Sequence, residues 1–134
     1  MIFVDTGAWF ALAVREDPDH PAAAAFLDRN SEPLITTDLV AVETMTLLRY
    51  GDRRRSGLAS IVGDDLWEGR AARLHLCTSD DILAAREIFR TFSEKSFSFT
   101  DCASFAVMQT LRIERAFAFD GHFDQYPGIS RVPR

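Results

Sequence analysis

Lysine is almost absent from this chain, since Lys95 is the only one among 134 residues. Enzyme mechanisms that need a reactive amine therefore have a single candidate. Cysteine is also scarce: Cys77 and Cys102 are too few for a disulfide scaffold, and their spacing matches no zinc-binding motif. Both cysteines are expected to be small buried residues.

Long apolar runs and linkers are absent as well. No apolar run approaches the roughly 20 residues that a transmembrane helix requires. The sequence does not start with a basic segment followed by a long apolar one, so a cytoplasmic location is expected. No stretch rich in Ser, Gly or Pro divides the chain. With 47% hydrophobic residues, residues 1–134 are predicted to form one domain with a continuous core.

The net charge of -5 argues against a protein that holds duplex nucleic acid mainly by neutralising many phosphates. A nuclease remains compatible with this charge, because an acidic centre that binds cations lowers the total. The basic cluster Arg53, Arg54 and Arg55 follows a predicted helix end. It is either a solvated cluster near the negative end of the helix dipole or a contact for an RNA backbone.

Short apolar runs alternate with segments of helical periodicity, which is typical of an α/β fold with a mostly parallel sheet. Strands are expected at 1–4, 34–36, 73–77, 116–119 and 129–132. Helices are expected at about 6–15, 20–29, 38–50, 56–67, 79–92 and 101–111, with Thr100 as the N-cap of the last. The apolar stripe of the fifth helix, which includes Leu83 and Phe89, is predicted to lie in the core.

Asp5 lies between the apolar run Met1 to Val4 and a helical segment. The unbroken apolar run predicts a buried central strand, and open α/β sheets bind ligands at the carboxyl ends of such strands. An Asp before a helix is also a preferred N-cap. Taken alone, Asp5 is therefore either a cap or part of a site.

Asp120 repeats this position, since it follows the apolar run 116–119. The alternative is that Asp120 and Gly121 form a type I′ hairpin turn. Pro127 and Gly128 soon interrupt the return strand that a hairpin would need.

Two further carboxylates lie on helices that face the predicted core. Glu43 has Val40 and Leu47 at i-3 and i+4, so it is placed on the inward face, where it must be paired, protonated or bound to a cation. An internal salt bridge to an arginine is the alternative. Asp101 falls in the first turn of its helix, where the helix dipole favours an anion.

Strands that alternate with helices can bring all four carboxylates to one end of a parallel sheet. Together, the four segments that carry them resemble a PIN domain, specifically the VapC-type toxins of bacterial toxin–antitoxin pairs. The resemblance covers the whole chain. It is carried by Val4-Asp5-Thr6, Val42-Glu43-Thr44, Phe99-Thr100-Asp101-Cys102-Ala103 and Ala118-Phe119-Asp120-Gly121-His122-Phe123.

This resemblance implies a three-layer α/β/α fold and a metal-dependent endoribonuclease, often acting on transfer RNA, that is restrained by a small VapB-type antitoxin. It also implies a homodimer, with Mg²⁺ or Mn²⁺ as the cofactor. The implied catalytic acids are Asp5, Glu43, Asp101 and Asp120, of which Asp5, Asp101 and Asp120 are metal ligands. Thr6 is a residue that would orient Asp5 or a water, and Asp124 is an extra acid or a substitute for Asp120.

Electrostatic repulsion among the four carboxylates is an independent reason to expect a bound cation. Two unit charges about 4 Å apart repel by roughly 4 kcal/mol at an effective dielectric of about 20, so several ionised carboxylates need a cation or a proton. Mg²⁺ prefers oxygen ligands, whereas no pair of histidines has a spacing that favours zinc. Such an ion would acidify water for in-line attack on a phosphodiester.

Four other functions compete with this hypothesis. Asp5-Thr6-Gly7 also matches the catalytic tripeptide of aspartic proteases, but those enzymes are all-β and this chain has helical patterns. A phosphatase would need an Asp two residues after Asp5, which is absent. Cys102 as a nucleophile has no indicated histidine base. The main alternative is a catalytically silent PIN-like module that binds RNA or protein, which Mg²⁺-dependent RNA cleavage would distinguish.

Overall fold

The fold is built on a five-stranded sheet in a computed structural model that describes residues 1–51 and 55–134. The strand order is β3-β2-β1-β4-β5, and all four strand pairs are parallel. This confirms the predicted α/β class; the expected mostly parallel sheet is parallel in every described pair. The strands are β1 (Ile2–Val4), β2 (Leu34–Thr37), β3 (Arg73–His75), β4 (Arg115–Phe117) and β5 (Ser130–Val132).

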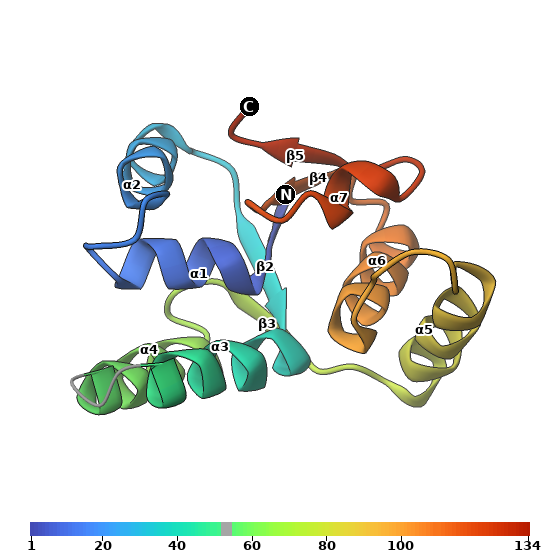
Figure 1. The fold of residues 1–134 in the computed structure, drawn as a ribbon, viewed down its shortest axis with the longest axis horizontal. Helices are drawn as coiled ribbons and strands as arrows, with labels where there is room; N and C mark the ends of the chain where they lie inside the picture. The colour runs from blue at the N-terminus through green and yellow to red at the C-terminus, as the bar shows by residue number, and fades with distance from the viewer. Residues whose placement is uncertain (52–54) are drawn as a thin grey trace.

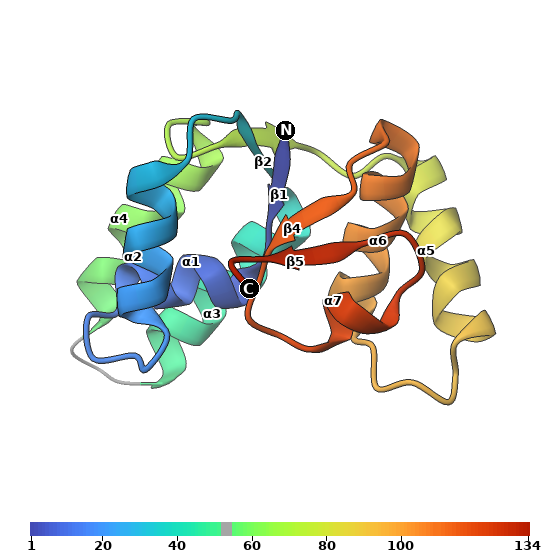
Figure 2. The same ribbon diagram turned by 90° about the horizontal axis from the view of Figure 1, so that it is seen from above.

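Helices cover the sheet in two groups, as Figures 1 and 2 show. The first four helices lie on one side, and α5 and α6 lie on the other, which gives the expected α/β/α layers. The helices are α1 (Thr6–Ala13), α2 (His20–Arg29), α3 (Asp38–Gly51), α4 (Ser56–Trp67), α5 (Ser79–Thr91), α6 (Phe99–Leu111) and α7 (His122–Gln125). Within the described residues, every helix is too short or too polar to cross a bilayer.

The central position of β1 determines where the carboxylates meet. All three residues of β1 are buried, because the strand pairs with β2 on one side and β4 on the other. The backbone N–H of Asp5 donates to Phe117 O at 3.0 Å, so the chain leaving β1 lies beside the end of β4. At such a point the strand order reverses, and a crevice forms at the carboxyl ends of the strands.

Helix α6 is the most deeply buried helix of the fold. Every residue from Asp101 to Met108 is buried, because α6 packs between the sheet and α5. This burial follows from the apolar sequence of the helix and places its first turn at the same edge as Asp5.

Several predicted boundaries are wrong by a few residues. The N-cap of α6 is Ser98 and not Thr100, because Asp101 at N3 bonds back to Ser98. Helix α5 begins at Ser79, as expected, and Thr78 forms the same capping box with Asp81. The expected fifth-helix stripe is only partly core, since Leu83 and Phe89 are 58% and 51% exposed. The hairpin alternative at Asp120-Gly121 is also wrong, because β4 and β5 are parallel and α7 lies between them.

Candidate active site

Asp5 is a carboxylate buried at the junction of β1 and α1. It occupies the N-cap position of α1, but its side chain makes no capping hydrogen bond, and the residue is only 4% exposed. Burial raises its pKa to about 7, a hydrogen bond with the Thr6 backbone opposes the rise, and the charges of Asp101, Glu43 and Asp120 add to it. The capping interpretation therefore does not account for this side chain.

Asp101 is held at the start of α6 by a reciprocal capping box. Its backbone N–H donates to Ser98 Oγ at 3.0 Å, and the Ser98 N–H donates to Asp101 Oδ2 at 3.0 Å. The residue is 6% exposed. One carboxylate oxygen is thereby fixed by the fold, while Oδ1 has no hydrogen bond from a described residue.

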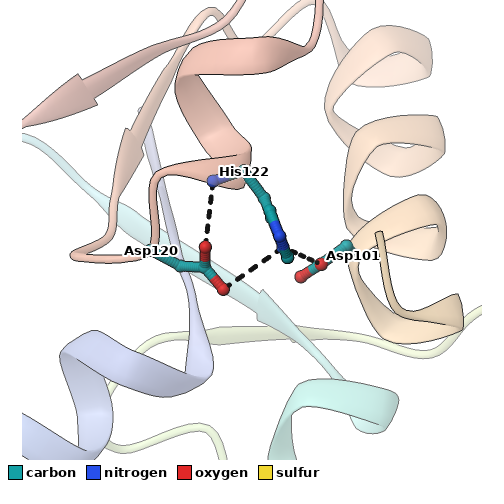
Figure 3. A group of neighbouring side chains, drawn as sticks. All are labelled: Asp101, Asp120 and His122. Carbon is teal, nitrogen blue, oxygen red and sulfur yellow. Dashed lines mark hydrogen bonds and ion pairs between the residues drawn. The ribbon is translucent and has the colours of Figure 1, made fainter. Parts of the chain in front are cut away.

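His122, at the start of α7, bridges Asp101 and Asp120 (Figure 3). Its Nδ1 lies 2.9 Å from Asp101 Oδ2 and 3.4 Å from Asp120 Oδ2, and its backbone N–H donates to Asp120 Oδ1 at 2.9 Å. The imidazole also packs edge-on against Phe97, with ring centroids 5.6 Å apart. The second carboxylate is thus fixed by the residue that bridges it to the first.

These three side chains form a group that could hold a metal ion. One ligand atom from each of Asp101, Asp120 and His122 lies within 4.8 Å of the others. The donor set is mainly carboxylate oxygen with one imidazole nitrogen, which suits Mg²⁺ through the oxygens and Mn²⁺ through both. Sequence reasoning missed His122, because no local signal around Asp120 distinguishes it from Asp124.

A second Asp–His pair in the fold shows which part of this arrangement is structural. At α5, Asp81 forms the same capping box with Thr78, and Asp81 Oδ2 lies 2.8 Å from His75 Nε2. There the pKa of Asp81 is lowered, with the hydrogen bond from His75 as the largest of the effects that oppose its burial. A capped Asp with a histidine is therefore a structural unit by itself. What distinguishes Asp101 is the proximity of Asp120 and Asp5.

Replacing Ser98 by alanine tests whether the N-cap, besides stabilising α6, also positions the Asp101 carboxylate for metal binding. Losing the hydroxyl should cost about 1 kcal/mol of stability, as N-cap removal does elsewhere. Thr78→Ala is the matched control, because it removes the corresponding bond at α5, away from Asp5. Thermal melts should show similar losses in the two variants, whereas only Ser98→Ala should weaken Mn²⁺ binding in a titration. Equal effects on metal binding would show that the Ser98 cap supports the helix alone.

Glu43 lies close enough to act on Asp5, but it does not belong to the group of Asp101, Asp120 and His122 that could hold a metal ion. It is half-buried on α3, and its charge contributes to the raised pKa of Asp5. Among the described residues it has no ion pair of the kind that the salt-bridge alternative requires. The predicted inward face is narrower than expected: Val40 is fully buried, but Leu47 is 46% exposed.

Asp124 is engaged by Arg131, and the Thr6 hydroxyl makes no hydrogen bond to a carboxylate of the described residues. Asp124 pairs with Arg131, whose hydrogen bond holds the pKa of Asp124 below its usual value. It does not belong to the group formed by Asp120. Thr6 Oγ1 is buried and has no hydrogen-bond partner among the described residues, so it does not bond to Asp5 here.

The predicted basic cluster can be placed only in part. Arg53 and Arg54 lie outside the described residues. Arg55 is half-buried, with its guanidinium 5.1 Å from the centroid of the Phe10 ring, which is a cation–π distance.

The competing chemistry at Cys102 finds no support. The thiol is fully buried, and burial raises its pKa to about 11, so the nucleophilic thiolate is disfavoured. Cys77, expected to be buried, is half-buried, and burial followed by a hydrogen bond with Asp38 raises its pKa to about 12. An aspartic protease is excluded by the parallel α/β fold.

A parallel α/β sheet with carboxylates gathered at its carboxyl edge is the arrangement of a PIN domain. The chain belongs to the PIN-domain family, whose model matches residues 2–129. It is 35% identical over 123 residues to the 23S rRNA-specific endonuclease VapC20 of two Mycobacterium tuberculosis strains, and the match covers 92% of each chain. The crystal structure of Mycobacterium tuberculosis VapC20, described as a Sarcin-Ricin loop cleaving toxin, superposes with a TM-score of 0.87 at 32% identity, covering 96% of this chain and 97% of that one.

Proposed function

We propose that this protein is the toxin of a type II toxin–antitoxin pair and a divalent-metal-dependent endoribonuclease. The observation that carries the proposal is the convergence of Asp5, Asp101 and Asp120 at one edge of the sheet, with Glu43 close enough to affect the pKa of Asp5. Burial and like charges raise the pKa of Asp5 to about 7, so its carboxylate holds a proton readily, and a bound cation would take the place of that proton.

The residues at this edge fit Mg²⁺ or Mn²⁺. Asp5, Asp101 and Asp120 are the proposed ligands, and the buried hydroxyl of Thr6 next to Asp5 has an unused hydrogen-bonding capacity. A bound cation would supply Lewis acidity and activate water for attack on the phosphodiester. The chain itself fixes one oxygen of Asp101 through Ser98 and one of Asp120 through His122. We assign Glu43, the half-buried fourth acid, to orienting the attacking water.

For the substrate, the relatives favour ribosomal RNA over the transfer RNA that the family resemblance suggests. The protein with which this chain shares 35% identity is named for cleavage of 23S rRNA, and the solved structure is named for cleavage of the sarcin–ricin loop. We therefore propose a hairpin of large-subunit ribosomal RNA as the substrate. Arg53, Arg54 and Arg55 are proposed to contact the phosphate backbone of the RNA.

For partners, we propose a VapB-type antitoxin and a homodimer. Exposed apolar side chains on the outer layer support a protein partner: Val42 and Tyr50 on α3 border a groove against α4, and both are more than half exposed. Leu83 and Phe89 are exposed on α5, on the opposite side of the sheet. We propose that exposed apolar residues on the two sides of the sheet contact the antitoxin and a second copy.

Cleavage of defined RNAs by the purified, antitoxin-free protein tests this function. We expect cutting of a sarcin–ricin hairpin with 10 mM Mg²⁺ or Mn²⁺ and none after addition of EDTA, with 5′-phosphate and 3′-hydroxyl ends. Transfer RNA, incubated in parallel, should stay intact. Binding of the hairpin without cleavage under either metal would instead support a catalytically silent RNA-binding module.

A further inference from the structure

The segment that carries Asp120 and His122 is anchored in the core by Phe123, whose fully buried ring packs edge-on against Phe105 of α6. It leaves β4 after Phe117 and enters α7, a helix of four residues. Its internal hydrogen bonds run from the N–H of Phe123 to Asp120 O and from that of Asp124 to Gly121 O, so they shape the turn without anchoring it. The Asp120 side chain is 45% exposed. The buried ring of Phe123 and the contact of His122 with Asp101 hold the α7 end of the turn. The end that carries the partly exposed Asp120 needs a contact from outside the turn.

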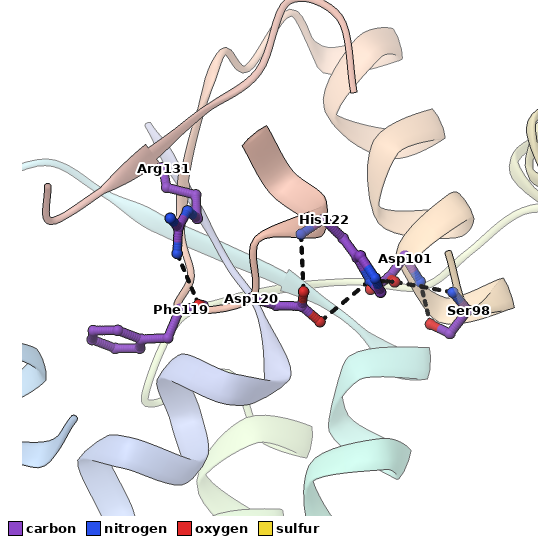
Figure 4. Close-up of polar contacts among 6 residues, drawn as sticks. All are labelled: Ser98, Asp101, Phe119, Asp120, His122 and Arg131. Atoms are coloured by element: carbon purple, nitrogen blue, oxygen red, sulfur yellow. Dashed lines mark hydrogen bonds and ion pairs between the residues drawn. The ribbon is translucent and has the colours of Figure 1, made fainter. Parts of the chain in front are cut away.

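Arg131 on the edge strand β5 supplies that connection (Figure 4). Its Nη1 donates to Phe119 O at 2.8 Å, one residue before Asp120. Its Nε donates to Asp124 Oδ2 at 2.8 Å, and its Nη2 lies 2.6 Å from the same oxygen. One guanidinium thus bonds to the chain on both sides of the Asp120–His122 turn.

We propose that Arg131, together with Asp124, is a positioning residue for Asp120 and His122. The planar guanidinium offers several donors in fixed directions. It therefore fixes the distance between the end of β4 and α7, in addition to neutralising the charge of Asp124. Asp124 then acts through Arg131 and is not a metal ligand. The consequence for catalysis rests on the proposed function, whereas the consequence for the shape of the turn does not.

A second arginine on the same sheet provides a matched control. Arg115, at the start of β4, pairs with Glu32 at the opposite, amino-terminal edge of the parallel strands. Arg115→Gln removes an Arg–carboxylate pair of similar exposure without touching the turn. Arg131→Lys keeps the charge but loses the multiple donors of the guanidinium.

Hydrogen–deuterium exchange of the metal-free protein tests the positioning directly. In Arg131→Gln, the peptide spanning residues 118–124 should exchange at least several-fold faster than in the wild type, and Arg131→Lys should resemble Arg131→Gln. Arg115→Gln should leave this peptide unchanged. If Arg131→Gln and Arg115→Gln affect residues 118–124 alike, the proposal is overturned, whether or not the protein is a nuclease.

Mn²⁺ titration followed by electron paramagnetic resonance tests the consequence for the acids. Arg131→Gln should weaken Mn²⁺ binding by roughly 10-fold, as loss of a residue that orients a ligand does. Removing a positive charge by itself would tighten binding, so the two explanations differ in sign. In an Asp120→Asn background, Arg131→Gln should cause no further weakening, because the carboxylate ligand that Arg131 positions is already removed.

The same titration separates failure of this proposal from failure of the proposed function. Tighter Mn²⁺ binding in Arg131→Gln would mean that charge dominates or that the released Asp124 becomes a ligand, and it would overturn the positioning role. Equal weakening with and without Asp120 would also overturn it. If the wild type binds no Mn²⁺, the metal-dependent function fails, and the exchange experiment alone decides the role of Arg131.

Discussion

Replacing either Asp5 or Asp101 by asparagine should reduce RNA cleavage by at least about 1,000-fold, which corresponds to roughly 4 kcal/mol of lost transition-state stabilisation. Both are buried carboxylates of the same cluster, and the amide has the same shape without the charge. The cation that the proposed reaction requires would then lose a ligand. The measurement is the initial rate of cleavage of the sarcin–ricin hairpin at saturating Mg²⁺.

The control for this prediction is Asp28→Asn, which makes the same chemical change at an exposed position on α2. Its cleavage rate should stay within about twofold of the wild type. Circular dichroism should show the same helix content in all three variants, because Asp5 makes no side-chain capping bond and Asp101 keeps the Ser98 cap. Full activity in both Asp5→Asn and Asp101→Asn would remove the nuclease assignment.

The sequence predicts the position of Asp5 well because the evidence for it is local. An unbroken apolar run can be buried on both faces only as a central parallel strand, and β1 is such a strand. The first-turn position of Asp101 was predictable for the same reason, since capping depends on residues three apart. Even there, the N-cap is Ser98 and not the predicted Thr100, because Ser98 has an Asp at i+3, as a capping box requires, whereas the residue three after Thr100 is Ala103.

The residues next to Asp120 in the sequence do not indicate the roles of His122 and Asp124. Both lie within four residues of Asp120, and nothing in that stretch shows which of them faces Asp101. The distinction arises because β5 returns beside β4 and brings Arg131 against Asp124 and Phe119. This contact depends on the packing of an edge strand, and a hydrophobic pattern does not specify it.

The exposed apolar residues of α5 show a similar limit. Leu83 and Phe89 continue a helical stripe, and periodicity predicts burial for the whole stripe. In the fold, α5 covers α6 from the outside, so part of a wide stripe extends past the contact. Sequence periodicity gives the direction of an apolar face, whereas its covered width depends on the neighbouring element or on a partner.

The metal-free protein should become more stable at pH 8 when Asp5 is replaced by asparagine. The pKa of Asp5 is raised from 3.8 to about 7 on folding, so between these values the folded state binds more protons than the unfolded state. Stability from this group therefore falls as pH rises from about 4 to 7, and above that range the full penalty applies. At 1.36 kcal/mol per pKa unit, the penalty has an upper bound of about 4 kcal/mol.

Asp5→Asn removes this penalty, so at pH 8 its melting temperature in EDTA should exceed that of the wild type by roughly 10 °C. At pH 4 the difference should nearly vanish, because the wild-type carboxyl is then protonated in the folded state. Adding 10 mM Mg²⁺ should stabilise the wild type and leave Asp5→Asn almost unaffected, because only the wild type has the full set of ligands. Asp28→Asn should show none of these pH-dependent differences, since Asp28 is exposed. A lower melting temperature for Asp5→Asn at pH 8 would mean that the buried carboxylate stabilises the metal-free fold, and the crowding that makes a cation necessary would then be absent.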